Sequence, residues 1–121
     1  MPAKGFTIKK DNELIREYEK WTLVRKSLGL RSFGMNMVDL KPGERIPEHT
    51  ETDRDQEEVF IVLKGTATMV IDDTEYDAPE GTFIRLDPAP RRYAINKGNS
   101  DVRLLIVSAP TTSGYQSMDW A

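Results

Sequence analysis

The chain has 121 residues, of which 17 are Lys or Arg and 20 are Asp or Glu, so its formal net charge is -3. A domain of this size can bury a hydrophobic core large enough to fold without disulfides or metal ions. The acidic net charge excludes the basic surface of a nucleic-acid-binding protein. The chain contains no cysteine, which excludes disulfides, thiolate metal sites and a cysteine nucleophile.

The first ten residues, MPAKGFTIKK, contain no apolar run, so we expect no signal peptide, no membrane contact and a cytoplasmic location. Residues 11–21, DNELIREYEKW, have a helical composition with Asp11 as a candidate N-cap. A short helix, a single turn and an extended arm are all open for this segment. We therefore treat residues 1–20 as an N-terminal arm or short helix.

Six strand-sized apolar segments follow, each rich in β-branched or aromatic residues. They span residues 21–30, 33–40, 58–65, 66–72, 81–86 and 102–110. Turn residues separate them, at 41–44, 71–75, 78–81, 87–90 and 96–101. Tight hairpin tips are expected at Asp72-Asp73 and at Asn99-Ser100.

This pattern predicts an all-β, single-domain, antiparallel sandwich or barrel over residues 21–110. Closure of the sheet is favoured because open edges invite aggregation. The tail, residues 111–121, carries Tyr115, Met118 and Trp120 on a polar background. Aromatic residues near a terminus favour docking, so we expect the tail to pack on the barrel or on a dimer partner.

The stretch between Pro42 and Gly65 contains the only histidine, His49, among several acidic residues. These acidic residues are Glu48, Glu51, Asp53, Asp55, Glu57 and Glu58. Strand alternation points His49 and Glu51 the same way, and an inward Glu58 brings Phe60 and Val62 with it. An apolar face with polar groups at one end predicts a ligand pocket at a barrel mouth. Asp53, Asp55 and Glu57 are expected to form a solvated loop face, because the glycine of a calcium loop is missing.

The spacing of this stretch resembles the first motif of the cupin superfamily, G-x5-H-x-H-x3/4-E-x6-G. The motif positions are taken in order by Gly43, His49, Glu51, Glu58 and Gly65. Residues 81–96 resemble the second cupin motif, G-x5-P-x-G-x2-H-x3-N, with Arg92 at its histidine and Asn96 at its end. The loop between Glu51 and Glu58 is two or three residues longer than the family's, and Asp87 and Ala89 replace the proline and glycine.

The resemblance implies a jelly-roll-like β-barrel of six to eight strands, usually a homodimer, and often a divalent metal held by three His and one Glu. The family's metal-dependent activities include dioxygenation, decarboxylation and sugar isomerisation. The resemblance also implies that Asn36, Val38 and Leu40 point inside the barrel, which makes Asn36 a candidate polar residue of the pocket. On the last strand we expect Leu104 and Ile106 in the pocket wall.

Arg92 changes the chemistry of the family's metal site. A guanidinium is charged at any physiological pH and has no lone pair for a cation. Two buried carboxylates need a counter-charge, so we expect Arg92 to neutralise Glu51 and Glu58 where the family holds its metal. An acidic small molecule is then the expected ligand, with Arg92 as anchor and His49 as a proton shuttle.

Two alternatives stay open beside this metal-free binding site. His49, Glu51 and Glu58 offer a mix of imidazole and carboxylate ligands that suits Mn, Fe, Ni or Zn in a metal-dependent cupin enzyme. A non-catalytic sensing or structural cupin is the second alternative, so whether the protein is an enzyme stays open. A homodimer is expected, with residues 21–28 or the tail near Trp120 at the interface.

Overall fold

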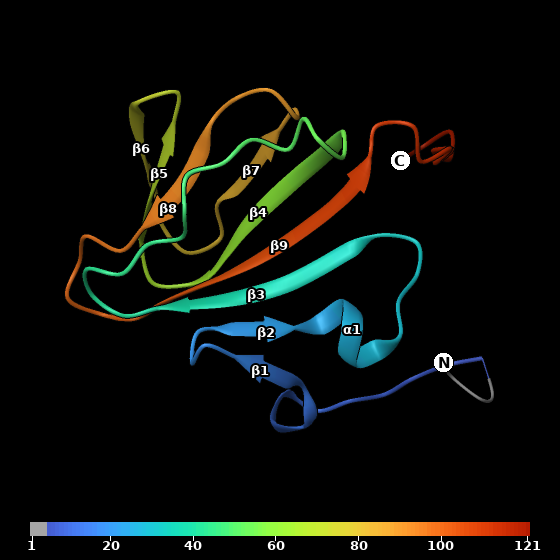
Figure 1. Cartoon of the computed structure of the whole chain (residues 1–121), viewed down its shortest axis with the longest axis horizontal. Coiled ribbons are helices and arrows are strands. Elements are labelled where there is room, and N and C mark those ends of the chain that lie inside the picture. Colours follow the sequence, from blue (N-terminus) through green and yellow to red (C-terminus); the bar gives the residue numbers. More distant parts are fainter. Residues whose placement is uncertain (1–4) are drawn as a thin grey trace.

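The computed structural model describes residues 5–121 as two antiparallel β-sheets (Figure 1). The larger sheet has six strands in the order β1-β2-β3-β9-β4-β7, and the smaller has three in the order β6-β5-β8. The strands are β1 (Ile15–Glu17), β2 (Trp21–Leu23), β3 (Gly34–Leu40), β4 (Gln56–Lys64), β5 (Ala67–Ile71), β6 (Thr74–Ala78), β7 (Phe83–Leu86), β8 (Arg92–Ile95) and β9 (Val102–Pro110). The expected all-β antiparallel fold is confirmed.

Helix is confined, within the described residues, to the 3-10 turn η1 (Asp11–Glu13) and the five-residue helix α1 (Val24–Leu28). Over residues 5–121, no helix combines the length and the apolar character that a membrane crossing requires.

The hydrophobic core lies between the two sheets. Alternate residues of β3, β4 and β9 point inward and meet the inner face of β5 and β8. The core residues with almost no exposed surface include Val38, Leu40, Phe60, Val62, Ala67, Met69, Ala94, Val102 and Leu104. The central strand of the larger sheet is β9, which pairs with β3 along one edge and β4 along the other. The pocket described below is therefore built on the most extensively paired part of the fold.

The region before β3 differs from the expected one. The prediction of a single strand over residues 21–30 is wrong beyond Leu23, because the strand β2 ends there and the helix α1 begins at Val24. Arg25, Lys26 and Leu28 are good helix formers, and Gly29 ends the helix with a φ of 70° and an N–H that bonds back to Arg25 and Lys26. Residues 11–21 form the turn η1 and then β1, so the larger sheet begins before residue 21.

Two strands of the smaller sheet were not expected. Residues 74–78 and 92–95 form β6 and β8, although charged residues interrupt their apolar pattern. The tip at Asp72-Asp73 is confirmed, since both residues have positive φ and Ile71 pairs with Thr74. The prediction of a hairpin tip at Asn99-Ser100 is wrong, because the bend there links β8 in the smaller sheet to β9 in the larger sheet.

The C-terminal tail forms no strand after β9. Tyr115, Met118 and Trp120 are exposed in the single chain, by 78%, 65% and 84% respectively. These three side chains therefore do not find cover on their own barrel, and packing of the tail on a partner stays a prediction.

The last residue of each motif has a structural role. Gly65 has a φ of +76°, and a Cβ there would lie 2.4 Å from the carbonyl oxygen of Asp101. Asn96 is fully buried, and its amide nitrogen donates to the carbonyls of Leu40 at 2.9 Å and Ser100 at 2.8 Å. Its side-chain oxygen accepts from the N–H of Gly98 at 3.0 Å. Asn96 therefore ties the end of β3 to the link between the two sheets.

We expect Asn96→Ala to lower the free energy of unfolding by about 3 kcal/mol, because it leaves buried backbone groups without partners. Chemical denaturation monitored by circular dichroism measures this change. Asn99→Ala, at an exposed position of the same bend, is the matched control and should change stability by less than about 0.5 kcal/mol. Equal effects of the two substitutions would contradict the role given to Asn96.

Candidate functional site

A pocket of about 500 Å³ opens between the inner face of the larger sheet and the segment that joins β3 to β4. Its polar lining consists of Asn36, His49, Glu51, Gln56, Glu58 and Ser108. Its apolar lining includes Trp21, Met35, Ile46, Phe60 and Ile106. Two arginines, Arg25 and Arg54, complete the wall. The pocket thus combines an apolar floor with acidic, basic and imidazole groups.

Backbone hydrogen bonds hold the segment with His49 and Glu51 against β8. The N–H of His49 donates to the carbonyl of Arg92 at 3.1 Å, and the N–H of Arg92 donates to the carbonyl of His49 at 2.9 Å. Two residues on, the N–H of Glu51 donates to the carbonyl of Pro88 at 2.9 Å. This extended path points both side chains to the same side, as alternation predicts.

His49, Glu51 and Glu58 converge at the bottom of the pocket. The Nε2 atom of His49 lies 3.1 Å from Glu51 Oε2 and 3.8 Å from Glu58 Oε1. The other ring nitrogen, Nδ1, lies 3.0 Å from the carbonyl oxygen of Pro47. Both nitrogens therefore face acceptors, and a neutral imidazole has only one N–H. The geometry favours the imidazolium form.

The pKa of His49 is raised above its usual 6.5 by this environment. The nearby carboxylate of Glu58 contributes most to the rise, and the Pro47 carbonyl and the charge of Glu51 add to it. Partial burial of the ring acts in the opposite direction. Since Glu51 is the nearer carboxylate by distance, we treat the two carboxylates as sharing the imidazolium proton.

Arg92 lies behind this cluster and outside the pocket lining. Its side chain has no exposed surface, Nη1 lies 3.4 Å from Glu58 Oε1, and Nη2 donates to the carbonyl of Asp87. In the described part of the chain, Nε and Nη1 of Arg92 and Oε1 of Glu58 have no hydrogen-bond partner. Arg92 therefore forms the expected ion pair with Glu58 but none with Glu51 among the described residues. Because Arg92 does not line the pocket, it contacts Glu58 from behind the pocket wall, and the expected direct contact between Arg92 and a ligand is not available.

The other expected site residues divide between pocket and core. Asn36, Phe60 and Ile106 line the pocket. Leu104 does not, because it points into the core with 1% of its surface exposed. The acidic loop residues Asp53, Asp55 and Glu57 are exposed, and Glu57 forms an ion pair with Arg85.

Arg25 and Arg54 are pocket residues that the sequence analysis missed. Arg54 lies in the loop before β4 and faces Glu51, three residues earlier, with Nη2 to Oε1 at 3.5 Å. The unusual length of that loop was the available signal for Arg54. Arg25 reaches the pocket because residues 24–28 turn into a helix, and the strand expected there hid this position.

The charges of the site nearly cancel without any added ion. Glu51 and Glu58 are both almost fully buried, and each lies within 3.5 Å of an arginine nitrogen, from Arg54 and Arg92 respectively. His49 adds positive charge when protonated. At the same time, His49, Glu51 and Glu58 each offer a ligand atom within 4.8 Å of the others, which has the composition of a metal-binding group.

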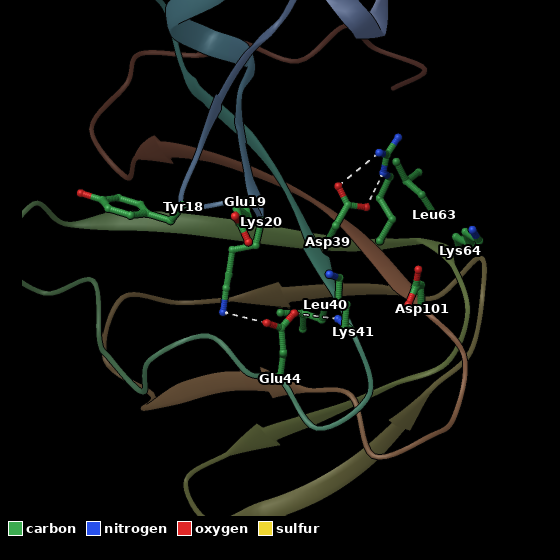
Figure 2. A pocket seen from close by; sticks show the side chains of 11 residues that line it. Tyr18, Glu19, Lys20, Asp39, Leu40, Lys41, Glu44, Leu63, Lys64 and Asp101 are labelled. Carbon is green, nitrogen blue, oxygen red and sulfur yellow. Dashed lines mark hydrogen bonds and ion pairs between the residues drawn. The ribbon is translucent and has the colours of Figure 1, made fainter.

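A second cavity, of about 580 Å³, lies at the opposite end of β3 (Figure 2). Four of its charged groups form two pairs: Lys20 lies 3.8 Å from Glu44, and Arg103 donates to Asp39 at 2.7 Å. Its lining contains no imidazole, and its carboxylates do not belong to the potential metal-binding group of His49, Glu51 and Glu58. The pocket around His49 is the better candidate site.

Comparison with known proteins agrees with the two-sheet architecture. A family model described as Cupin domain matches residues 36–108, which include all of β4 to β8 and most of β3 and β9. No match was found among curated proteins.

Solved structures with the same fold include a cupin protein from Bacteroides fragilis, with a TM-score of 0.79, 18% identity, and coverage of 94% of this chain and 92% of that one. A sugar phosphate isomerase from a cupin superfamily of Silicibacter pomeroyi has a TM-score of 0.66 and 22% identity over 75% of this chain and 59% of that one. A structure described as a predicted oxalate decarboxylase from Thermotoga maritima has a TM-score of 0.59 and 19% identity, over 64% and 65% of the two chains.

In protein treated with a chelator, we expect His49 to titrate above pH 6.5 when folded. The folded state then holds the proton more tightly than the unfolded state. The resulting stabilisation is full below pH 6.5 and is lost as the pH rises through the folded pKa. A proton NMR titration of the hydrogen on Cε1 of His49 measures the folded pKa directly, because the chain has only 1 histidine.

Glu58→Gln should lower the pKa of His49, since it removes the largest contribution to the rise. Glu57→Gln, at the exposed neighbouring position of β4, is the matched control and should leave that pKa unchanged. A folded pKa at or below 6.5 in the parent protein would contradict the geometry described for this cluster.

Proposed function

This chain belongs to the cupin family, and from that premise we propose that it binds a small organic acid in the pocket around His49, without a resident metal. The observation that carries the proposal is the state of the two pocket arginines. Arg25 and Arg54 face the same pocket from different elements, and within residues 5–121 neither guanidinium has a partner closer than 3.4 Å.

The contacts of these arginines are long compared with those elsewhere in the chain. Arg25 reaches only the carbonyl of Leu30, at 3.4 Å, and Arg54 reaches only Glu51, at 3.5 Å. By contrast, Arg103 binds Asp39 at 2.7 Å. Guanidinium groups bind carboxylates strongly when two parallel hydrogen bonds form. Arg25 and Arg54 therefore have hydrogen-bonding capacity left for an anionic ligand.

A bound acid would take Arg54 from Glu51. Glu51 would keep its contact with His49, so its buried carboxylate would not be left without a partner. The apolar part of the ligand would lie against Trp21, Phe60 and Ile106, which line the same pocket. His49 is the group that would carry a proton to or from the ligand, because its nitrogen lies between two carboxylates.

The charge balance supports a site without metal. Arg92 and Arg54 already face the two carboxylates, so the buried negative charge has counter-charges of its own. A divalent cation would leave the cluster with excess positive charge, only a short distance from the fully buried Arg92. Two of the structural neighbours are named for anionic substrates, a sugar phosphate and oxalate, which agrees with the ligand class proposed here.

A divalent-metal centre is the second candidate function. It is favoured by the convergence of His49, Glu51 and Glu58 within 4.8 Å and by Oε1 of Glu58, which has no hydrogen-bond partner among residues 5–121. A metal held there would supply Lewis-acid chemistry to a bound carbonyl or carboxylate. In that case His49 and the two carboxylates would bind the ion, while Arg25 and Arg54 would still orient an acidic substrate.

We expect malonate or succinate to bind chelator-treated protein with 1:1 stoichiometry and to shift the Cε1 signal of His49. Isothermal titration calorimetry and NMR measure the two effects. Arg25→Gln and Arg54→Gln should each weaken binding by about tenfold, the loss of about one charge-assisted hydrogen bond. The matched control is Arg31→Gln, an exposed arginine just after α1 that does not line the pocket.

Binding that Arg25→Gln and Arg54→Gln leave unchanged would contradict the proposed anion contacts. Absence of binding for malonate, succinate and inorganic phosphate alike would contradict the ligand class.

We expect the parent protein to bind neither Mn²⁺, Ni²⁺ nor Zn²⁺ stoichiometrically, and Arg92→His to gain affinity for all three. The substitution removes the guanidinium beside Glu58 and adds a ligand nitrogen at the family's third histidine position. Calorimetric titration of both proteins measures the difference, with circular dichroism to confirm that the variant is folded. Stoichiometric metal in the parent that His49→Gln abolishes would establish the second candidate instead.

A further inference from the structure

Hydrogen bonds fix both ends of the loop before β4 that carries Arg54. At its start, the N–H of Glu51 donates to the carbonyl of Pro88 at 2.9 Å. At its end, the N–H of Gln56 closes the loop by donating to the carbonyl of Glu51 at 3.1 Å. The side-chain amide of Gln56 also donates to the carbonyl of Arg54, at 3.0 Å. The backbone around Arg54 is therefore held, although 78% of the Arg54 side chain is exposed.

Asp55, the residue after Arg54, connects this loop to the end of β9. Gln56, the first residue of β4, pairs with Pro110, the last residue of β9, and the two strand ends lie side by side (Figure 1). Beyond that pair, the carbonyl of Asp55 accepts from the N–H of Thr111 at 2.9 Å. The carboxylate of Asp55 accepts a second hydrogen bond, from the hydroxyl of Thr111. These two hydrogen bonds between Asp55 and Thr111 form a clamp next to the pocket residues Arg54 and Gln56.

The backbone conformation of Asp55 explains why the clamp includes a side chain. Asp55 has a φ of 52°, in the left-handed region that residues with a Cβ seldom adopt. Asp tolerates this region better than most residues, because its short polar side chain can form a hydrogen bond locally. The backbone bond alone would continue the pairing of β4 with β9, whereas the carboxylate bond to Thr111 also stabilises the left-handed turn. Arg54 directly precedes this turn, and its guanidinium faces Glu51 and the pocket.

We propose that Asp55 is a positioning residue for the ligand, because through the clamp it holds Arg54 where the anionic group binds. This inference rests on the proposed function, since it takes Arg54 as a ligand contact. The loop between Glu51 and Glu58 is longer than the cupin spacing, and extra residues that become ordered only on binding reduce the affinity. Within residues 5–121 the guanidinium of Arg54 has one polar contact, with Glu51 at 3.5 Å. The order that Arg54 needs before binding therefore comes from the backbone at Asp55.

Charge and position predict opposite effects for loss of the Asp55 carboxylate. Asp55 is an anion near a site proposed for anions, so by charge alone its replacement with alanine would strengthen the binding of an acid. By position, the same substitution weakens binding, because Arg54 loses the turn that directs it toward the pocket. Asp53, an exposed acid two residues earlier in the same loop, lies outside the clamp and is the matched control for the charge.

Calorimetric titration of malonate into chelator-treated protein tests the proposal. We expect Asp55→Ala to weaken binding about fivefold, the loss of about one hydrogen bond, and Thr111→Val to weaken it by a similar factor. Asp55→Asn keeps an acceptor for the Thr111 hydroxyl and tolerates the left-handed φ, so it should retain the parent affinity. Asp53→Ala removes the same charge without changing the clamp, and should bind malonate at least as tightly as the parent protein.

A double-mutant cycle separates positioning from a general loss of structure. If Asp55 acts through Arg54, Asp55→Ala has no further effect on malonate affinity in an Arg54→Gln background. In an Arg25→Gln background it keeps its full effect. Circular dichroism checks that each variant is folded, and Thr111→Val takes the place of Asp55→Ala in the cycle if the latter does not fold.

Equal effects of Asp55→Ala and Asp53→Ala, in a protein whose parent binds malonate, overturn the role of Asp55 and leave the proposed function intact. A weakening by Asp55→Ala that persists in the Arg54→Gln background has the same consequence. A parent protein that binds neither malonate, succinate nor inorganic phosphate overturns the proposed function and this inference together.

Discussion

The pocket depends on one buried positive charge. The guanidinium of Arg92 has no exposed surface and lies between Glu58 and the carbonyl of Asp87. Removal of a charge from water is unfavourable unless partners replace the solvent. Arg92 therefore depends on the carboxylate of Glu58 as its charged partner, and that carboxylate in turn raises the pKa of His49. The electrostatics of the pocket floor thus follow from a residue that lies outside the pocket lining.

This arrangement changes how a cupin pocket can select its ligand. A metal ion attracts whatever donor atoms reach it, and the protein controls access. Here the positive charges are arginines, which have direction as well as charge, because a guanidinium presents its donors in one plane. Arg25 comes from α1 and Arg54 from the loop before β4, so the positions of two independent segments would set the spacing between the anionic groups of the ligand proposed for this pocket.

The sequence predicted the fold and the clustering of His49, Glu51 and Glu58, but not all of the side chains around that cluster. The spacing from Gly43 to Gly65 and from Gly81 to Asn96 located His49, Glu51 and Glu58 together, because strand pairing carries spacing directly into geometry. Side chains on irregular segments could not be placed in this way. Arg25 became a pocket residue because local helix propensity prevailed over an apolar pattern typical of a strand. Leu104 went to the core because the two sheets close over it.

β4 carries two different surfaces on a single strand. Glu58 and Phe60 face the pocket, while Val59 and Ile61 face outward. Residues on one face of β4 can therefore be substituted without disturbing the other face. The length of the strand between Glu58 and Ile61 cannot change, because a change would exchange the two faces. A one-residue insertion would turn the carboxylate out of the pocket and a valine or isoleucine into it. The register between β4 and β9 shifts only after Val62, beyond the pocket residues, and that irregularity is where a change in chain length can be absorbed.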